Sequence, residues 1–511
     1  MQSFDKLRES GSLYVDKTAL IYDLVNRFSY VFLSRPRRFG KSLLMSTIGN
    51  YFEGNKSLFK GLEIEKYEKE WMSYPVLRMD LSAEHYDDLP KLRGVISDYL
   101  SEWEKSYGAD GENKSLSQRF YHVIQNAYNK SGKKRVVILI DEYDQPMLEN
   151  LNNDEKRNEI RGELQGFYSV LKKADEFIRF AMITGVTKFT HVDIFSGLNN
   201  LMDISLMDDY NDICGVSESE FKSYFSESVK IFAEKNSSSI SEVEKKFKNK
   251  YDGYHFSKKG EGIYNPFSLL KAFASGDAND YWFQSGTPSF LADAVKDFQV
   301  PAYDFGEAER TADQLMDQPV EKPDLYTILF QSGYLTIKGY NRETEEYRLG
   351  FPNEEVKKAF WQVLYRYFIA PYSSDNALSA KCFAQDLESG DINGFMARLQ
   401  SIVASSNHGQ ERRMEVHFRN VISIVFHMLG YWPNVEVPVA AGFTDLVVKV
   451  KNYIYIFEFK IDSTPAKALE QIERKGYQLM YGADKRKVIL IGAVFSKETG
   501  HLERWEYKSI S

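Results

Sequence analysis

The pattern of apolar positions divides the first two hundred residues into short strands and amphipathic helices. Continuous apolar runs at 30–33 and 136–140 predict strands that are buried on both faces, as in a parallel sheet. Two further strands are expected at 75–81 and 177–183. Helical apolar spacing marks the stretches between them, at 19–28, 43–51, 89–107, 116–128 and 154–173. This order predicts a three-layer α/β/α domain with a mainly parallel sheet over residues 1–210.

The remaining chain shows two different patterns of apolar residues, first mostly helical and then mixed helix and strand. Ser217 and Glu220 form a capping-box pattern, and helical spacing follows at 218–226 and 241–251. We expect a small pair of strands at 328–337 and 347–351, within a mostly helical connector over 211–375. A helical stretch at 412–429, strands at 446–450 and 453–460, and a helix around Gln471 then predict a C-terminal α/β domain over 376–511.

The turn after the first strand carries the residues of a phosphate site. Gly40, Lys41 and Ser42 open the helix that follows this strand. Backbone N–H groups and the positive helix end can face phosphates there, the lysine adds a charge, and the serine can ligate Mg²⁺. We therefore assign Gly40 and Lys41 to the phosphates of ATP, and Ser42 to the nucleotide and its metal. The pattern usually has Gly where Arg35 stands, so a chance GKS at a helix start remains an alternative.

Three arginines precede this turn. Arg35, Arg37 and Arg38 bring three guanidinium groups next to the phosphate site, a composition that favours anion contact over packing. We assign Arg37 and Arg38 to the nucleotide. A solvated charged turn is the alternative.

Polar residues at the ends of two later strands complete the predicted nucleotide site. Strand 136–140 ends in Asp141 and Glu142. In phosphate-loop enzymes the first acid holds Mg²⁺ and the next polarises the attacking water, so we assign Asp141 to the metal and Glu142 to catalysis. Thr184, at the end of strand 177–183, is a candidate sensor of the γ-phosphate, although a plain polar strand end is an equal alternative.

A second set of charged residues lies near the C-terminus. A hairpin between the last two predicted strands would bring Asp445 near Glu458, and alternation along a strand puts Lys460 on the same face as Glu458. Two carboxylates beside a lysine predict a Mg²⁺ site for phosphodiester cleavage, with Mn²⁺ as a second suitable ion and both acids as ligands. Glu415 is a candidate further ligand, and Gln471 could orient Lys460 or substrate. A hairpin with exposed charges is the alternative.

Composition limits the class of protein. The chain has 511 residues, which predicts two or three domains, and its 43% hydrophobic and 27% charged content is ordinary for a soluble protein. No apolar run approaches the roughly 18 residues of a membrane span, and the N-terminus lacks the apolar core of a secretory signal. We expect a cytoplasmic protein with no membrane partner. The net charge is −8, yet the last hundred residues are slightly basic, so a nucleic-acid surface is expected there.

Short motifs in both halves resemble known families. YVDKT, RPRRFGKSLL, LIDEYDQP and TGVTKF resemble the AAA-ATPase-like proteins frequent in anaerobic bacteria, in which Arg recurs at the first position of the phosphate-loop motif. GFTDLVV, FEFK and ALEQIERKGY resemble the PD-(D/E)xK nuclease domain found fused to those ATPases. The resemblance covers roughly residues 4–205 and 380–505. It implies a P-loop NTPase fold, a restriction-endonuclease-like fold, and the sites already assigned at Lys41, Ser42, Asp141 and Glu142 and at Asp445, Glu458 and Lys460.

The expected function follows from this combination. ATP binding and hydrolysis by the N-terminal domain would regulate a Mg²⁺-dependent nuclease that acts on nucleic acid, with DNA the favoured class. The alternative is a nucleotide-switched module that binds nucleic acid or protein without cutting. The intact set of Asp445, Glu458 and Lys460 favours cleavage, because a module that only binds has no need of all three. We also expect a homo-oligomer through the ATPase domain.

Overall fold

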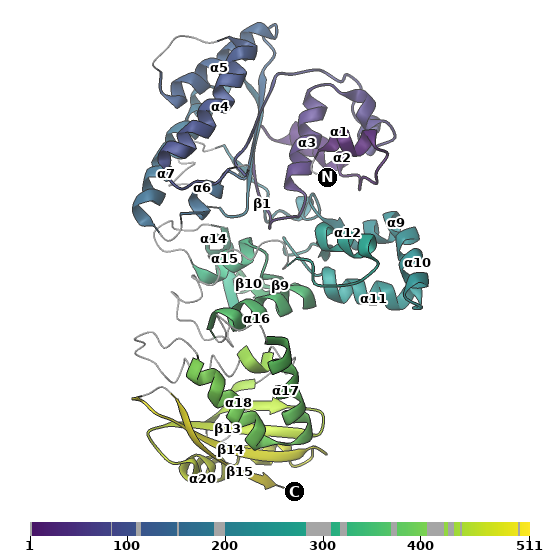
Figure 1. The fold of residues 1–511 in the computed structure, drawn as a ribbon. Helices are drawn as coiled ribbons and strands as arrows, with labels where there is room; N and C mark the ends of the chain where they lie inside the picture. Colours follow the sequence, from purple (N-terminus) through teal and green to yellow (C-terminus); the bar gives the residue numbers. More distant parts are fainter. Residues whose placement is uncertain are drawn as a thin grey trace. The chain divides into compact units, whose positions relative to one another are not determined.

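The computed structural model describes residues 3–82, 84–108, 114–150, 153–188, 200–282, 308–316, 324–368, 376–405, 424–427, 434–439, 442–498 and 501–510. The chain divides into two compact units, the first made of Met1–Gly286 with Glu307–Val356 and the second of Thr287–Gly306 with Lys357–Ser511 (Figure 1). The connector predicted over 211–375 is called the middle region below. Its described part up to Val356 belongs to the first unit. The division into domains at 1–210, 211–375 and 376–511 stays a prediction.

The first unit is built on a five-stranded parallel sheet. Its strand order is β2 (Val76–Asp80), β3 (Val136–Asp141), β4 (Ile178–Gly185), β1 (Tyr30–Ser34) and β5 (Met202–Asp203). All side chains of β1 and β3 are buried, as their continuous apolar runs predicted. The sheet therefore needs cover on both faces.

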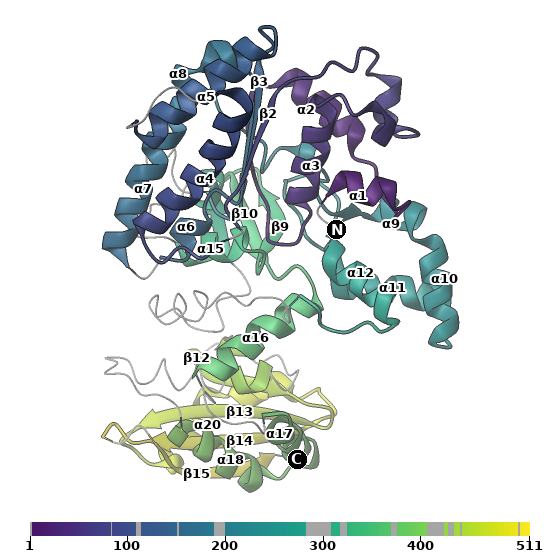
Figure 2. The same cartoon turned by 45° about the horizontal axis from the view of Figure 1, so that its top comes forward.

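Helices supply that cover. One face carries α4 (Leu89–Tyr107), α5 (Leu116–Lys130), α6 (Gln145–Leu148), α7 (Asp154–Tyr168) and α8 (Val170–Lys173). The other carries α1 (Phe4–Glu9), α2 (Thr18–Arg27) and α3 (Lys41–Phe52), as Figures 1 and 2 show. The predicted three-layer α/β/α arrangement is confirmed. The predicted helix 154–173 is interrupted at Ser169, where α7 ends and the short α8 begins.

The middle region adds helices around an aromatic core. Its first elements are β6 (Val216–Ser217), α9 (Glu218–Tyr224), α10 (Ser226–Lys235), α11 (Ile240–Tyr251), β7 (Ile263–Tyr264) and α12 (Pro266–Ser275). The Ser217 side chain accepts from the backbone N–H of Glu220, and the Glu220 side chain accepts in return, which confirms the capping box. Phe221, Phe232 and Phe247 pack in the core between these helices.

The strand predicted at 328–337 is wrong except for its last two residues. Residues Leu325–Gln331 form helix α15, and strand β9 begins only at Thr336 (Thr336–Asn341). Asp324 caps the helix by accepting from the backbone N–H of Thr327 at 3.0 Å, and Gly333, with φ 88°, ends it. The neighbouring elements are β8 (Ala308–Thr311), α14 (Ala312–Met316), β10 (Glu346–Gly350) and α16 (Glu354–Phe368).

The second unit is a mixed sheet with helices. Its strands follow the order β11 (Asn434–Val439), β12 (Gly442–Lys449), β13 (Tyr453–Ile461), β14 (Lys487–Phe495) and β15 (Leu502–Ile510). The helical elements are α17 (Asn376–Ser389), α18 (Ile392–Ser405), α20 (Pro465–Lys475) and η8 (Tyr477–Tyr481). β13 and β14 run parallel, and the other neighbouring pairs are antiparallel. This agrees with the predicted C-terminal α/β domain.

Alternation along β13 sorts its side chains to two faces. Ile454 and Ile456 pack against Ile472 of α20, whereas Phe457 contacts Phe395 of α18 on the opposite face. Glu458 shares its face with Ile456, so it lies on the α20 side. Of the predicted helix 412–429 the structure describes only residues 424–427, which are helical. Among the described helices, none has the length and apolar character needed to cross a bilayer.

Glu355 in α16 makes the stability of the first unit depend on pH. Its side chain is 1% exposed and accepts from the backbone N–H groups of Tyr281 at 2.5 Å and Trp282 at 2.8 Å. Burial raises the pKa of Glu355 from 4.5 to about 7. An acid whose folded-state pKa is raised contributes stability at low pH and loses it as the pH rises through that value.

We predict that Glu355→Gln removes this loss. Glutamine keeps a carbonyl acceptor and carries no charge, so the variant should gain on the order of 3 kcal/mol over wild type between acidic and mildly alkaline pH. Thermal unfolding across that range measures the difference. Glu354→Gln, at the exposed neighbouring position, is the matched control and should show no such trend. An equal pH trend in both variants would contradict the assignment.

Candidate functional site

Lys41 is the first residue of α3 and directly follows the loop that leaves β1. Gly40 has φ 96°, a left-handed conformation that favours glycine and turns the chain into the helix. The Lys41 side chain is 3% exposed, and its Nζ donates to the carbonyl oxygens of Arg35 at 2.9 Å and Pro36 at 3.4 Å. Nζ also forms an ion pair with Glu142 Oε1 at 3.2 Å. The structure therefore brings together the predicted phosphate lysine and the predicted catalytic acid.

Glu142 is held in an unusual conformation. Its φ is 52°, which is uncommon for a residue with a Cβ atom and directs the chain sharply away from the end of β3. Burial raises the pKa of its carboxyl group, and the positive charge of Lys41 opposes that rise. Oε2 is buried and has no hydrogen-bond partner among the described residues. This carboxylate thus depends on Lys41 and has one oxygen available for a ligand or water.

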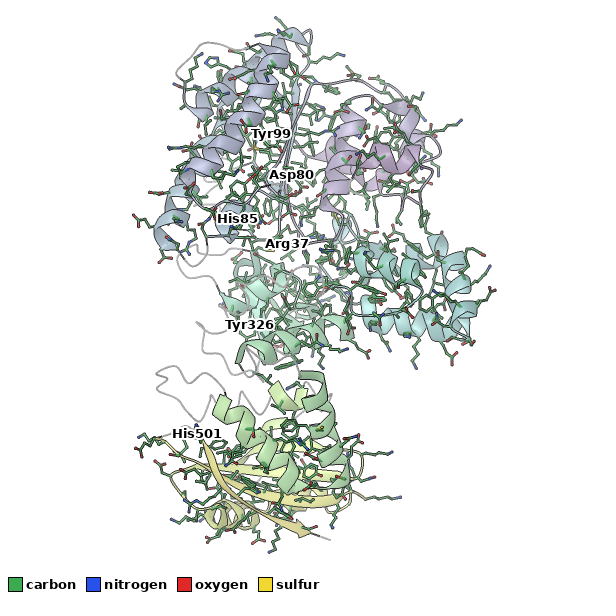
Figure 3. All side chains as sticks on the ribbon, in the orientation of Figure 1. Arg37, Asp80, His85, Tyr99, Tyr326 and His501 are labelled. Carbon is green, nitrogen blue, oxygen red and sulfur yellow. The ribbon has the colours of Figure 1, made fainter. Side chains whose placement is uncertain are left out.

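The ends of neighbouring strands meet at Asp141. Thr184 Oγ1, from the end of β4, donates to Asp141 Oδ1, so the predicted metal ligand and the predicted sensor touch. Asp80, the last residue of β2, is paired in register with Asp141. The Tyr99 hydroxyl donates to the backbone carbonyl of Asp80 at 3.0 Å (Figure 3). Asp80 was not assigned to the site from the sequence. The available signal was that this acid lies near the end of a predicted strand, as Asp141 does.

Asp144 ties the end of β4 to the segment after β3. Its fully buried carboxylate accepts from the backbone N–H groups of Val186 at 3.1 Å and Thr187 at 2.6 Å, and from Thr187 Oγ1 at 2.6 Å. Burial raises the pKa of Asp144. A Cβ at Gly185 would lie 2.5 Å from Asp144 Oδ1, so glycine is required for this close approach. Asp144 was also missed, although it stands in the motif LIDEYDQP.

The three arginines have different environments. Arg35 is 1% exposed, donates to the carbonyl oxygens of Ser205 at 2.8 Å and Tyr210 at 3.0 Å, and lies 4.2 Å from the ring centroid of Phe256. Burial lowers its pKa to about 10, so it remains charged at neutral pH. Packing therefore explains Arg35, which anchors the loop and is not directed to phosphate.

Arg37 and Arg38 are exposed. Arg37 donates to Gln145 Oε1 at 2.7 Å, and Figure 3 labels its position. The Arg38 guanidinium lies 3.9 Å from the ring centroid of Phe267. Their predicted contact with the nucleotide stays a prediction.

The nucleotide residues fit ATP with Mg²⁺. Lys41, Ser42 and Asp141 belong to the beginning of α3 and the end of β3, and the orphan oxygen of Glu142 lies at the same edge of the sheet. Mg²⁺ in such sites is held by one or two side chains together with phosphate oxygens. Within the described ranges no three His, Cys, Asp or Glu side chains form a metal-binding group. The metal assignments of Ser42 and Asp141 stay predictions.

The acids of the second unit also meet as expected. Glu458 is 2% exposed, and its Oε1 accepts from Lys460 Nζ at 3.0 Å and from Gln471 Nε2. Asp445 Oδ2 accepts from the backbone N–H of Phe459 at 2.8 Å. Burial, and then the charge of Asp445, raise the pKa of Glu458, whereas Lys460 lowers it. The two carboxylates repel each other, which a bound cation would relieve.

Glu458 Oε2 is a suitable metal ligand. It is buried and unpaired within the described part of the second unit. An unpaired buried carboxylate oxygen is costly, and a divalent cation would satisfy it. Glu415 lies outside the described residues, so its role as a further ligand stays a prediction.

Comparisons with known proteins identify a family for each of two parts of the chain. Residues 1–195 match the family described as "Predicted AAA-ATPase", and residues 413–505 match the PD-(D/E)XK nuclease superfamily. A protein of Azotobacter chroococcum mcd 1, titled "Uncharacterized protein in vnfD 5'region", is 35% identical over 98% of this chain and 96% of its own length. The ORC2 protein of Aeropyrum pernix, solved in ADPNP and ADP complexes, aligns with 69% of this chain and 93% of its own at 9% identity and a TM-score of 0.28. The chain therefore belongs to the family of predicted AAA-ATPases that carry a C-terminal PD-(D/E)XK nuclease superfamily domain.

Proposed function

We propose that the first unit binds and hydrolyses ATP and that its nucleotide state regulates Mg²⁺-dependent cleavage of nucleic acid by the second unit. The observation that carries the ATPase part is the 3.2 Å ion pair between Lys41 and Glu142. A phosphate that attracts Lys41 would take it from Glu142 and leave that carboxylate as a base. The raised pKa of Glu142 makes it a stronger base than an exposed glutamate.

The remaining residues of the nucleotide site have supporting roles. Ser42 and Asp141 would hold Mg²⁺, which supplies positive charge to the phosphates when bound. Thr184 bonds to Asp141, so it can sense a change at the metal side of the site. Arg37 and Arg38 are candidates for further phosphate contacts, and a homo-oligomer through this domain would offer a route for either to act in a neighbouring copy.

The chemistry of the second unit is proposed from Asp445, Glu458 and Lys460. The two acids would hold Mg²⁺ or Mn²⁺, which lowers the pKa of bound water and stabilises charge on a phosphate. Lys460 lowers the pKa of Glu458, which favours its carboxylate form, and offers a cation to the substrate. Gln471 fixes the Glu458 carboxylate through Oε1. Slightly basic sequence in this part of the chain supports nucleic acid, with DNA the favoured class, as the partner.

The test of the proposed function is cleavage of labelled single-stranded DNA, double-stranded DNA and RNA with Mg²⁺ or Mn²⁺, with and without ATP. Lys460→Ala should reduce cutting by about 10²-fold or more, because a charge that stabilises the transition state is lost. Lys41→Ala should retain cutting and lose its response to ATP. Binding without cutting of any substrate, with ATP still hydrolysed, would instead support the nucleotide-switched binding module.

Glu142→Gln is predicted to separate nucleotide binding from hydrolysis. Without a negative partner, Lys41 no longer has to leave an ion pair, so the affinity for ATP should rise by about tenfold. Hydrolysis should fall by about 10²-fold or more because the general base is lost. Equilibrium binding of a fluorescent ATP analogue and single-turnover hydrolysis measure the two effects. Glu155→Gln, an exposed acid of α7, is the control, and an unchanged affinity in Glu142→Gln would contradict the competition for Lys41.

Lys460→Met is predicted to move metal binding to higher pH. The Lys460 charge lowers the pKa of Glu458, so removal of that charge should raise the pKa further. Because a carboxylate must be deprotonated to bind a metal, the midpoint of Mn²⁺ binding should shift upward with it. Calorimetric titration with Mn²⁺ over a pH series measures the shift. Lys467→Met changes an exposed lysine of α20 and should leave the midpoint in place.

A further inference from the structure

Side chains of the phosphate loop, residues 35–42, pack against the middle region. Phe39 is 1% exposed, with its ring centroid 4.7 Å from that of Tyr254 and 5.2 Å from that of Phe256. A Cβ at Gly333 would lie 2.7 Å from Pro36 Cβ and 3.6 Å from Tyr254 Cε1, so Pro36 also packs closely on this region. Arg35 adds its contact with Phe256. These groups are closely packed, so the loop cannot change shape without displacing residues 254–256 or 333.

The same segment is joined to the residues that precede α16. Gly253, next to Tyr254, has φ 95°, and a Cβ there would lie 2.3 Å from the carbonyl oxygen of Pro352. Asn353 Nδ2 donates to the Asp252 carbonyl oxygen at 2.9 Å. Lys338 Nζ donates to the carbonyl oxygen of Pro352 at 3.0 Å. Residues 252–254 and 352–353 therefore form a close backbone contact that leaves no room for a side chain at position 253.

This contact also fixes the beginning of α16. Asn353 Oδ1 accepts from the backbone N–H of Val356 at 3.1 Å, which is an N-cap bond, while its Nδ2 holds Asp252. Glu355, in the first turn, is held by the backbone N–H groups of Tyr281 and Trp282. Helix α16 begins in the first unit and its residues from Lys357 onward belong to the second unit. One asparagine thus connects the segment that seats the phosphate loop to the helix that continues into the second unit.

We propose that residues 252–256 and 352–355 carry the nucleotide state of the phosphate loop to the first turn of α16, and through that helix to the second unit. The inference rests on the proposed binding of ATP by the first unit and names the route of its regulation. Phosphate binding draws Lys41 away from the carbonyl oxygens of Arg35 and Pro36, which changes the loop that carries Pro36 and Phe39. Tyr254 and Phe256 follow Phe39, and Gly253 and Asp252 then shift against Pro352 and Asn353.

The test is hydrogen exchange of the full chain with and without a non-hydrolysable ATP analogue. Slower exchange at residues 35–42 reports that the nucleotide binds. In wild type the nucleotide should also change the opening equilibrium of the first turn of α16 by about fivefold or more, the lower limit of typical coupling between sites.

Two variants interrupt the route in different ways. Gly253→Ala forces the contact with Pro352 apart, and Gly132→Ala is its matched control, since Gly132 also has positive φ (72°) but a Cβ there would meet no atom of the described chain within 4 Å. Asn353→Ser keeps an N-cap oxygen for α16 and removes the donor to Asp252. Asn353→Ser therefore removes the bond to Asp252 while the cap of α16 is kept, so an effect of this variant is not due to loss of the helix.

Both Gly253→Ala and Asn353→Ser should retain nucleotide protection at 35–42 and lose the response at α16, whereas Gly132→Ala should behave as wild type. Protection at 35–42 with no response at α16 in the wild type would overturn the inference and leave ATP binding intact. The inference would also be overturned if Asn353→Ser and Gly253→Ala, measured as separate variants, both kept the full response at α16. Absence of protection at 35–42 in the wild type would contradict the proposed ATP binding itself, and the route with it.

Discussion

The buried guanidinium of Arg35 is the interaction on which the arrangement of the first unit depends. It occupies the position where phosphate loops usually have glycine, and it is bonded to the carbonyl oxygens of Ser205 and Tyr210 and packed on Phe256. A buried charge that loses its partners costs several kcal/mol, so these segments must stay together. The loop is therefore held between the sheet and the middle region. These contacts make the middle region up to Val356 part of the first unit.

Both sites combine a lysine with a buried carboxylate, one oxygen of which has no hydrogen-bond partner in the described part of the chain. Lys41 pairs with Glu142 and Lys460 pairs with Glu458, at 3.2 and 3.0 Å. In each pair burial raises the pKa of the acid and the lysine opposes that rise. Such a pair is sensitive to an arriving ligand, because a phosphate competes for the lysine and a cation competes for the carboxylate. The electrostatics of the two units are thus alike although their folds differ.

Sequence patterns were sufficient for many of the elements and for several contacts within them. Continuous apolar runs identified β1 and β3 because a strand covered on both faces has no polar side to show. Alternation placed Glu458 and Lys460 on one face, and the structure joins them at 3.0 Å. The capping box at Ser217 was also readable, since its partners are three residues apart. Local periodicity carries this information.

What the sequence could not supply were contacts between distant segments. Asp80 and Asp144 join the edge of the sheet through strand order and through a close approach at Gly185, neither of which is written in their neighbouring residues. The environment of Arg35 depends on carbonyl groups about 170 positions away, and the close packing of residues 253 and 254 depends on Pro352 and Phe39. The sequence by itself determined the strands β1 and β3, the capping box at Ser217 and the shared face of Glu458 and Lys460, because each depends on neighbours along the chain. Tertiary structure alone decided which buried charges from distant segments face one another, as for Lys41 and Glu142, because that depends on how the elements pack.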